Sequence, residues 1–119
     1  MKIILFGSNG MLGSYIKAYL KDKWQVIPLT RADLNISKSN KEQIFSFLNN
    51  NIDRDDIIIN AAGLINQRHP SVFDSMKVNS VFPQILADFK IKKGCEVLHI
   101  TTDCVFNGIE GSYTETDYH

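Results

Sequence analysis

A glycine-rich stretch near the N-terminus constrains the fold of this chain more than any other feature. Residues 3–6, Ile-Ile-Leu-Phe, form a short apolar run typical of a buried strand, and Gly7, Gly10 and Gly13 follow it. Glycines at this spacing let a strand turn sharply into a helix whose first backbone N–H groups face a bound phosphate. Glycines also serve ordinary turns. The position of this triplet, between a strand pattern and a helix pattern, nevertheless favours a dinucleotide site.

Length and composition exclude several classes of protein. The 119 residues predict one domain, and the 13 basic and 13 acidic residues balance without a cationic block that would favour nucleic acid. No apolar stretch is long enough for a membrane span and no signal peptide is visible, so we expect a cytoplasmic protein without a membrane partner. Cys95 and Cys104 lie in no metal-ligand cluster. We therefore expect two reduced thiols and no metal site.

Short β-rich runs alternate with longer helical stretches along the chain. The predicted strands are residues 2–6, 25–29, 56–60 and 96–100. Such alternation predicts βαβ units, and hence an α/β fold in which a doubly wound parallel sheet of the Rossmann type forms the middle of three αβα layers.

Three helical regions are predicted between these strands. The first spans about residues 10–21 and directs Leu12, Ile16, Tyr19 and Leu20 toward the core. The second begins at a capping box made by Ser39 and Glu42 and ends in the asparagine run at 49–51. The third covers about residues 71–92, where Pro83 should kink or divide it and Gly94 suits its C-terminal cap.

The loops that follow the strands should carry the function, because an open parallel sheet binds its ligand at the carboxyl ends of its strands. After the second strand comes Arg31, which favours the 2′-phosphate of NADP, whereas an acidic residue there would favour NAD; a solvated surface arginine is the alternative. After the third strand come Ala61, Ala62 and Gly63, whose small side chains allow close approach to a nicotinamide or simply permit tight helix packing.

The fourth strand is followed by hydroxyl and carboxylate side chains at the same predicted edge. Thr101, Thr102 and Asp103 are polar residues that emerge from a buried strand, as reactive groups do in many enzymes. They are equally compatible with β-branched strand residues and a turn-capping aspartate.

Together these segments give the chain a resemblance that runs nearly end to end. It resembles the extended short-chain dehydrogenase/reductases, specifically their dTDP-4-dehydrorhamnose reductase-like branch. The similar segments are the glycine triplet, Leu-Thr-Arg-Ala-Asp-Leu-Asn-Ile at 29–36, Ile-Asn-Ala-Ala-Gly at 59–63, Val-Asn at 78–79, Tyr-Thr-Glu at 113–115 and His-Ile-Thr-Thr-Asp-Cys-Val-Phe-Asn-Gly at 99–108. The last of these is the most specific.

The resemblance implies a cofactor site for NADP, with NAD as the alternative. Asp33 and Ile36 would lie near the adenine, and Asn35 stands where the family usually carries an aspartate. The residues implied to bind the cofactor are Gly7, Asn9, Gly10, Met11, Leu12, Gly13, Arg31, Asp33, Asn35, Ile36, Ala61, Ala62, Gly63, Asn79 and Thr101.

The implied reaction is hydride transfer to the C4 ketone of a nucleotide-linked deoxysugar in polysaccharide biosynthesis. The implied catalytic residues are Thr102, whose hydroxyl would hydrogen-bond the substrate oxygen, and Asn79, which would order a water in a proton relay. The implied substrate contacts are Thr102, Asp103, Cys104, Val105 and Phe106, and Cys104 replaces a tyrosine usual in the family.

The family's Tyr-x-x-x-Lys pair, which supplies the proton, should lie beyond Glu115. Tyr19 and Lys23, at the end of the first helix, alone show that spacing. We interpret it as coincidence because this place is on the wrong side of the sheet from the nicotinamide. We therefore expect this chain to be the cofactor-binding part of a longer enzyme and to be inactive alone. Its sheet should end after the fourth main strand, and we expect the open edge of that sheet to favour self-association. The alternatives are a non-catalytic regulatory subunit, or a sugar-nucleotide epimerase or dehydratase.

Overall fold

A four-stranded parallel sheet forms the centre of the molecule. The computed structural model describes residues 1–102 and 107–118. The strands are β1 (Ile3–Phe6), β2 (Val26–Leu29), β3 (Ile57–Asn60) and β4 (Glu96–His99), and they lie in the order β2-β1-β3-β4. All neighbouring pairs are parallel, which confirms the predicted sheet. Each observed strand is one residue shorter than predicted.

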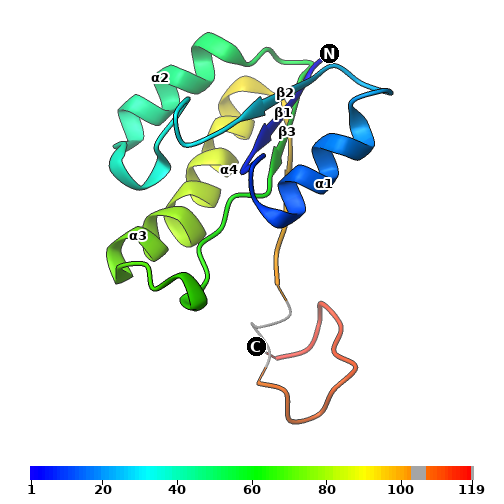
Figure 1. The fold of residues 1–119 in the computed structure, drawn as a ribbon, viewed down its shortest axis with the longest axis vertical. Coiled ribbons are helices and arrows are strands. Elements are labelled where there is room, and N and C mark those ends of the chain that lie inside the picture. Colours follow the sequence, from blue (N-terminus) through cyan, green and yellow to red (C-terminus); the bar gives the residue numbers. More distant parts are fainter. Residues whose placement is uncertain (103–106, 119) are drawn as a thin grey trace.

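Helices cover the sheet on both sides, as the doubly wound fold requires. The longer ones are α1 (Met11–Leu20), α2 (Lys41–Asn51) and α4 (Phe82–Lys93), with a shorter α3 (Val72–Met76). The remaining turns are η1 (Ile36–Lys38), η2 (Asn66–Arg68) and η3 (Lys77–Val81). Figure 1 shows α1 on one side of the strands and α2, α3 and α4 on the other, which gives the predicted three layers.

The larger core lies between the sheet and the pair α2 and α4. Phe6 and Phe82 meet there edge to face with ring centroids 5.1 Å apart, and both side chains are almost fully buried. A smaller core on the opposite face brings Ile16 and Leu20 of α1 onto β1 and β3. The prediction that Leu12 and Tyr19 also face the core is wrong, because both are exposed, at 42% and 60%.

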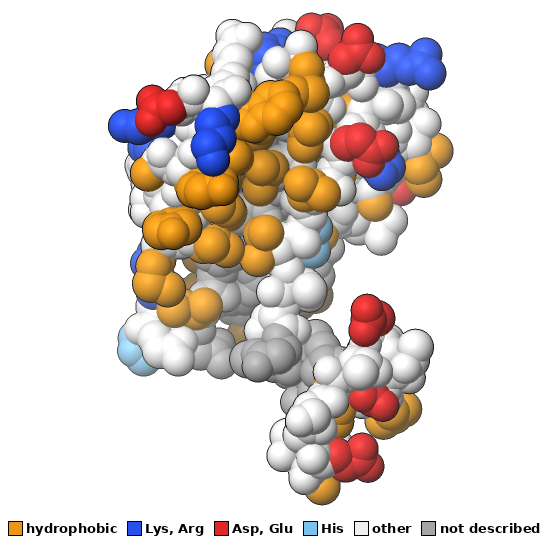
Figure 2. Space-filling model, turned by 90° about the vertical axis from the view of Figure 1, so that its right-hand side faces the viewer, with side chains coloured by type: hydrophobic (Ala, Val, Ile, Leu, Met, Phe, Trp, Pro, Cys, Tyr) orange, Lys and Arg blue, Asp and Glu red, His pale blue; other side chains and the backbone are white. Residues whose placement is uncertain are grey.

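One part of the sheet remains uncovered on the α1 side. α1 packs mainly against β1 and β2. Leu98 pairs with Ile59 and therefore points to this same face, where it is 55% exposed, and Ile100 is 42% exposed. Figure 2 shows hydrophobic side chains gathered over this side of the molecule.

The capping box of α2 lies one residue later than predicted. Asn40, not Ser39, is the N-cap: its Oδ1 accepts the Gln43 N–H at 2.8 Å, and Gln43 Oε1 accepts the Asn40 N–H at 2.9 Å. Ser39 is engaged elsewhere, because its hydroxyl donates to the Asn35 carbonyl at 2.7 Å. The hydroxyl that would have capped the helix therefore closes the preceding η1 turn.

Pro83 divides the third helical region as predicted, through a widened turn just before it. Proline lacks an N–H and its ring clashes with the carbonyl four residues earlier, which here belongs to Asn79. The η3 segment has π-helical geometry, and the Phe82 N–H bonds to the Lys77 carbonyl, five residues back. Gly94 ends α4 in the left-handed conformation with φ +83°, as predicted.

Asp56 joins the starts of β1 and β3 at the amino end of the sheet. Its side chain is 2% exposed and accepts the Lys2 N–H at 2.7 Å and the Asp53 N–H at 2.8 Å, with Lys2 Nζ 3.3 Å away. Burial alone would raise the pKa of Asp56, but these backbone hydrogen bonds and Lys2 outweigh it and lower that pKa.

We expect Asp56 to make the fold acid-sensitive. A lowered pKa stabilises the folded state above the unfolded value of about 4, and the contribution is lost as pH falls through the folded pKa. Asp56→Asn should lower the free energy of unfolding at pH 7 by about 1–3 kcal/mol, because its NH₂ group would face a backbone donor. Its unfolding free energy should then fall less between pH 7 and pH 3 than that of the unmodified chain. Urea unfolding at both pH values tests this, with exposed Asp55→Asn as the control; equal pH dependence in all three would contradict it.

The described residues include neither a membrane-spanning helix nor a cluster of potential metal ligands. No helix there is long and apolar enough to cross a membrane. No group of three or more potential metal ligands occurs within residues 1–102 and 107–118. Cys95 is a free, buried cysteine, and burial raises the pKa of its thiol.

Candidate dinucleotide-binding site

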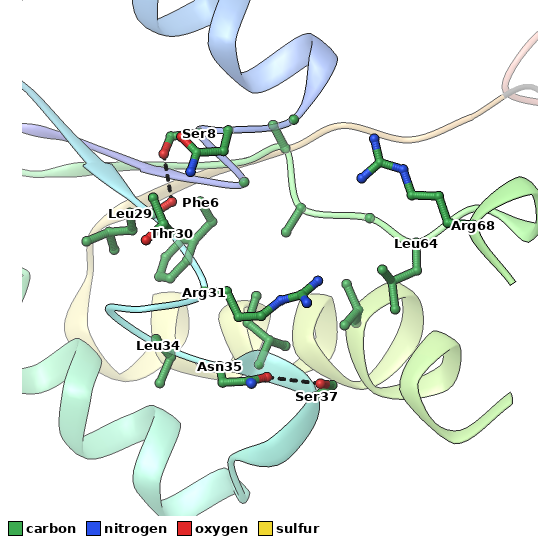
Figure 3. A pocket seen from close by; sticks show the side chains of 18 residues that line it. Phe6, Ser8, Leu29, Thr30, Arg31, Leu34, Asn35, Ser37, Leu64 and Arg68 are labelled. Carbon is green, nitrogen blue, oxygen red and sulfur yellow. Dashed lines mark hydrogen bonds between the residues drawn. The ribbon is translucent and has the colours of Figure 1, made fainter. Parts of the chain in front are cut away.

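A pocket of about 400 Å³ opens where β1, β2 and β3 end. The loops after these three strands form most of its wall, and Figure 3 shows the side chains that line it. Nine predicted cofactor-binding residues line it: Gly7, Asn9, Gly10, Arg31, Asn35, Ile36, Ala61, Ala62 and Gly63. The pocket therefore lies at the sheet edge where the sequence placed a ligand.

The glycine loop is held so closely that side chains would not fit at two of its positions. Gly7 has φ +75°, and a Cβ there would lie 2.6 Å from the backbone of Ala61 and Ala62. A Cβ on Gly13 would lie 2.0 Å from the Gly7 carbonyl oxygen. Gly13 is thus buried beneath the loop rather than lining the pocket, and it allows α1 to begin directly against the strand end.

The N-terminus of α1 keeps its backbone donors available. Its N-cap is Gly10, none of the described side chains caps it, and its first turn contains no acidic residue. The helix dipole favours an anion at this end. Met11 and Leu12 do not line the pocket with their side chains, which are 90% and 42% exposed. Any role of these two residues in holding a phosphate would come from their backbone.

Ser8 ties the glycine loop to the neighbouring strand and was not predicted. Its side chain is 1% exposed, and its hydroxyl donates to the Leu29 carbonyl at 2.9 Å, as drawn in Figure 3. The Ser8 N–H reaches the same carbonyl at 3.3 Å. This contact fixes the spacing between the loops after β1 and β2. A serine inside a glycine motif gave no signal for it.

The loop after β2 is closed by Asp33, which leaves Arg31 facing the pocket. Asp33 Oδ2 accepts the Thr30 N–H at 2.7 Å and the Thr30 hydroxyl at 3.0 Å. These hydrogen bonds, the backbone one first, lower the pKa of Asp33. Asn35 and Ile36 line the pocket, whereas Asp33 does not line it and is engaged in the turn.

The loop after β3 is shaped by a buried amide. Asn60 is fully buried; its Oδ1 accepts the Ala62 N–H at 3.1 Å, and its Nδ2 donates to Nδ1 of His99 at 3.1 Å. Because the first contact fixes the amide orientation, His99 must accept through Nδ1. Asn60 therefore sets the path of the pocket wall and links it to β4.

Asn79 holds the same loop farther along. Its Oδ1 accepts the Leu64 N–H at 2.9 Å and its Nδ2 donates to the Leu64 carbonyl at 2.8 Å. Asn79 does not line the pocket. In this structure the Asn79 side chain clamps the pocket loop from the widened turn that precedes Pro83.

The charges of the pocket are all of one sign. Arg31 and Arg68 line it, and none of the other lining residues in the described parts is charged. Among the described residues, neither guanidinium has an acidic or hydrogen-bonding partner. Arg68 was not among the predicted site residues, because it lies five residues beyond Gly63 in the loop after β3; its charge in that loop was the available signal.

Thr101 and Thr102 follow β4 at the same edge of the sheet. β4 is in register with β3 through Asn60 and His99, so the chain after His99 leaves the sheet beside the pocket loop. Both threonines are exposed and neither lines the pocket. The predicted substrate residues Asp103, Cys104, Val105 and Phe106 lie outside the described residues.

Comparisons with known proteins agree with this geometry. The family model described as the RmlD substrate binding domain matches residues 1–119. A dTDP-4-dehydrorhamnose reductase from Aggregatibacter actinomycetemcomitans is 32% identical over 121 residues, covering 98% of this chain and 40% of that protein. The crystal structure of a dTDP-4-dehydrorhamnose reductase from Clostridium acetobutylicum is similar with a TM-score of 0.83 and 33% identity, over 99% of this chain and 42% of that one.

A third similar protein was solved with a cofactor. The dTDP-4-dehydrorhamnose reductase from Bacillus anthracis in complex with NADP has a TM-score of 0.75 and 25% identity, over 93% of this chain and 40% of that one. The chain thus spans about two fifths of the length of these relatives. The match over its entire length shows that the chain belongs to the dTDP-4-dehydrorhamnose reductase family, through the domain described as the RmlD substrate binding domain.

Proposed function

We propose that this chain binds NADP(H) in the pocket at the ends of β1, β2 and β3, as the cofactor-binding part of a reductase that acts on a nucleotide-linked 4-keto-deoxysugar. One observation carries the proposal: a glycine-formed strand-to-helix junction opens into a pocket whose charged lining residues are two arginines. The chain as a whole is neutral. This local excess of positive charge suits a ligand that carries several phosphate charges.

The pocket offers separate features for the parts of such a cofactor. The glycine loop and the α1 N-terminus suit the diphosphate. Arg31 follows β2, where a ribose 2′-phosphate is bound in folds of this type. Apolar Leu34 and Ile36 form a wall for the adenine, and small Ala62 and Gly63 leave room for the nicotinamide side. These matches support NADP(H) over NAD(H).

Bound NADPH would supply the hydride for reduction of the C4 ketone. Thr102, which leaves the sheet beside the pocket loop, is proposed to hydrogen-bond the ketone oxygen and so stabilise the charge that develops on it. The proton donor and most of the substrate site would belong to other parts of the enzyme, since the relatives are about two and a half times as long.

Titration of NADPH and NADH into the 119-residue chain tests the cofactor assignment. Nicotinamide fluorescence and heat should both show saturable binding that favours NADPH. Absence of binding for both cofactors would refute the proposed cofactor site and would favour the non-catalytic regulatory subunit as the alternative. Binding without preference would leave a dinucleotide site but would contradict the NADP assignment.

We also propose that the isolated chain self-associates through the uncovered face of β4. Leu98 and Ile100 are exposed there, on a parallel strand whose outer edge has no partner in the described part of the sheet. Light scattering should give a mass above that of the 13.5 kDa monomer. The double change Leu98→Lys and Ile100→Lys should restore the monomer. Ile91 is exposed on α4, away from this face, so Ile91→Lys is the control and should leave the association unchanged. A monomer without any substitution would contradict the proposal.

A further inference from the structure

Arg68 is a charged pocket residue that the proposed function leaves without a role. It ends the η2 turn in the loop after β3 and extends toward the pocket, as Figure 3 shows. Its guanidinium has no partner among the described residues. An arginine that lines a pocket without an acidic neighbour is available to an anionic ligand.

The order of the strands separates Arg68 from Arg31. β1 lies between β2 and β3, so the glycine loop after β1 lies between the loop that carries Arg31 and the loop that carries Arg68. Figure 3 shows the two arginine side chains entering from these different sides. A ligand phosphate above the glycine loop is therefore approached from the β3 side by Arg68.

The N-terminus of α1 compensates only part of the charge of a diphosphate above the glycine loop. The helix end is equivalent to about half a positive charge, whereas a dinucleotide diphosphate carries about two negative charges. Arg31, placed to bind the 2′-phosphate, does not supply the difference. No other cationic side chain within the described residues lines the pocket.

We infer that Arg68 is a second anion-binding residue of this site and that it binds the cofactor diphosphate from the side opposite α1. The inference rests on the proposed function and assigns Arg68 the phosphates that NADPH and NADH share. Arg68 thus contributes affinity for both cofactors, while Arg31 contributes the choice between them.

The loop that carries Arg68 is held in place independently of the arginine. The Asn79 side chain bonds to the backbone of Leu64, and the Asn60 side chain accepts the Ala62 N–H. Arg68 itself is exposed and makes no described contact that its removal would break. Substitution of Arg68 should therefore leave the fold intact, so a change in binding reports on the ligand.

Titrations of NADPH, NADH and ADP into Arg68→Ala test this inference. We expect all three to bind about tenfold more weakly than to the unmodified chain, because each loses one charge-assisted contact to its diphosphate. Arg68→Lys should recover part of the affinity by retaining the charge. Arg54→Ala is the matched control: it removes the same charge beside Gly94, away from the pocket residues, and should bind all three unchanged.

Each other outcome identifies what has failed. Unchanged affinity of Arg68→Ala, with NADPH still bound by the unmodified chain, would overturn the role of Arg68 and leave the proposed function standing. Weaker binding of NADPH with unchanged affinity for NADH and ADP would assign Arg68 to the 2′-phosphate and overturn its assignment to the diphosphate. Absence of binding by the unmodified chain would overturn the proposed function and this inference together.

Discussion

Replacement of Gly13 by alanine is expected to destabilise the chain strongly. The new Cβ would lie 2.0 Å from the Gly7 carbonyl oxygen and 2.7 Å from its carbonyl carbon. Both atoms belong to a backbone that is itself pressed against Ala61 and Ala62. The overlap can be relieved only by moving α1 away from the sheet, since rigid interiors do not absorb such contacts locally.

We expect Gly13→Ala to lose about 3 kcal/mol or more of unfolding free energy, the upper part of the range for overpacked cores. For a domain of this size that corresponds to a fall in Tm of about 10 °C or more. Thermal unfolding followed by circular dichroism measures it. Saturating NADPH should restore little of the lost Tm, because the displaced α1 also carries the backbone donors that face the pocket.

Gly10→Ala is the matched control for this experiment. Gly10 has φ −72°, which any residue adopts, and its added Cβ would lie 3.3 Å from the Gly7 carbonyl oxygen. A small adjustment accommodates that contact, so the loss should be about 1 kcal/mol, similar to placing alanine at an N-cap. Equal stability of Gly13→Ala and Gly10→Ala would contradict the close packing of α1 onto the loop.

Arg31→Ala is expected to remove most of the preference for NADPH. The turn closed by Asp33 and Thr30 presents Arg31 to the pocket without a competing acidic partner among the described residues. A charge-assisted contact of this kind contributes about 1.5–3 kcal/mol. Its loss should weaken NADPH binding by about 10–100-fold.

NADH provides the internal control, because it lacks the 2′-phosphate. Its affinity for Arg31→Ala should change less than about twofold, the small effect expected for an uncontacted exposed charge. Calorimetric titration of both cofactors into both proteins measures the two changes. An equal loss for NADPH and NADH would assign Arg31 to the shared diphosphate and would contradict its role in cofactor choice.

The predicted site residues that line the pocket are those encoded by short contiguous segments. The step from an apolar strand to spaced glycines is local, so the residues of the loop were identified from their types and order. Arg31 and the small residues at 61–63 were found because they directly follow strands, and strand ends meet at one sheet edge. The structure places Gly7, Gly10, Arg31 and residues 61–63 around one pocket, whereas Gly13 lies beneath the loop.

The predictions of the α2 cap and of the buried face of α1 were wrong because the local sequence allowed more than one arrangement at each place. Ser39 with Glu42 and Asn40 with Gln43 are overlapping capping patterns, and the choice fell to Asn40 because the Ser39 hydroxyl binds the Asn35 carbonyl. Helical spacing allowed Leu12 and Tyr19 to face inward. The fit of Gly13 beneath the Gly7 carbonyl instead determines which face of α1 meets the sheet.

The sequence by itself determined the order of strands and helices, the glycine-formed entrance to α1 and the family, because each depends on periodicity or on short contiguous motifs. Only the tertiary structure decided that Asn79 clamps Leu64. It also decided that Arg68 lines the same pocket as Arg31. These roles depend on which distant loops meet in space, and parallel strand pairing brings those loops together across long sequence separations.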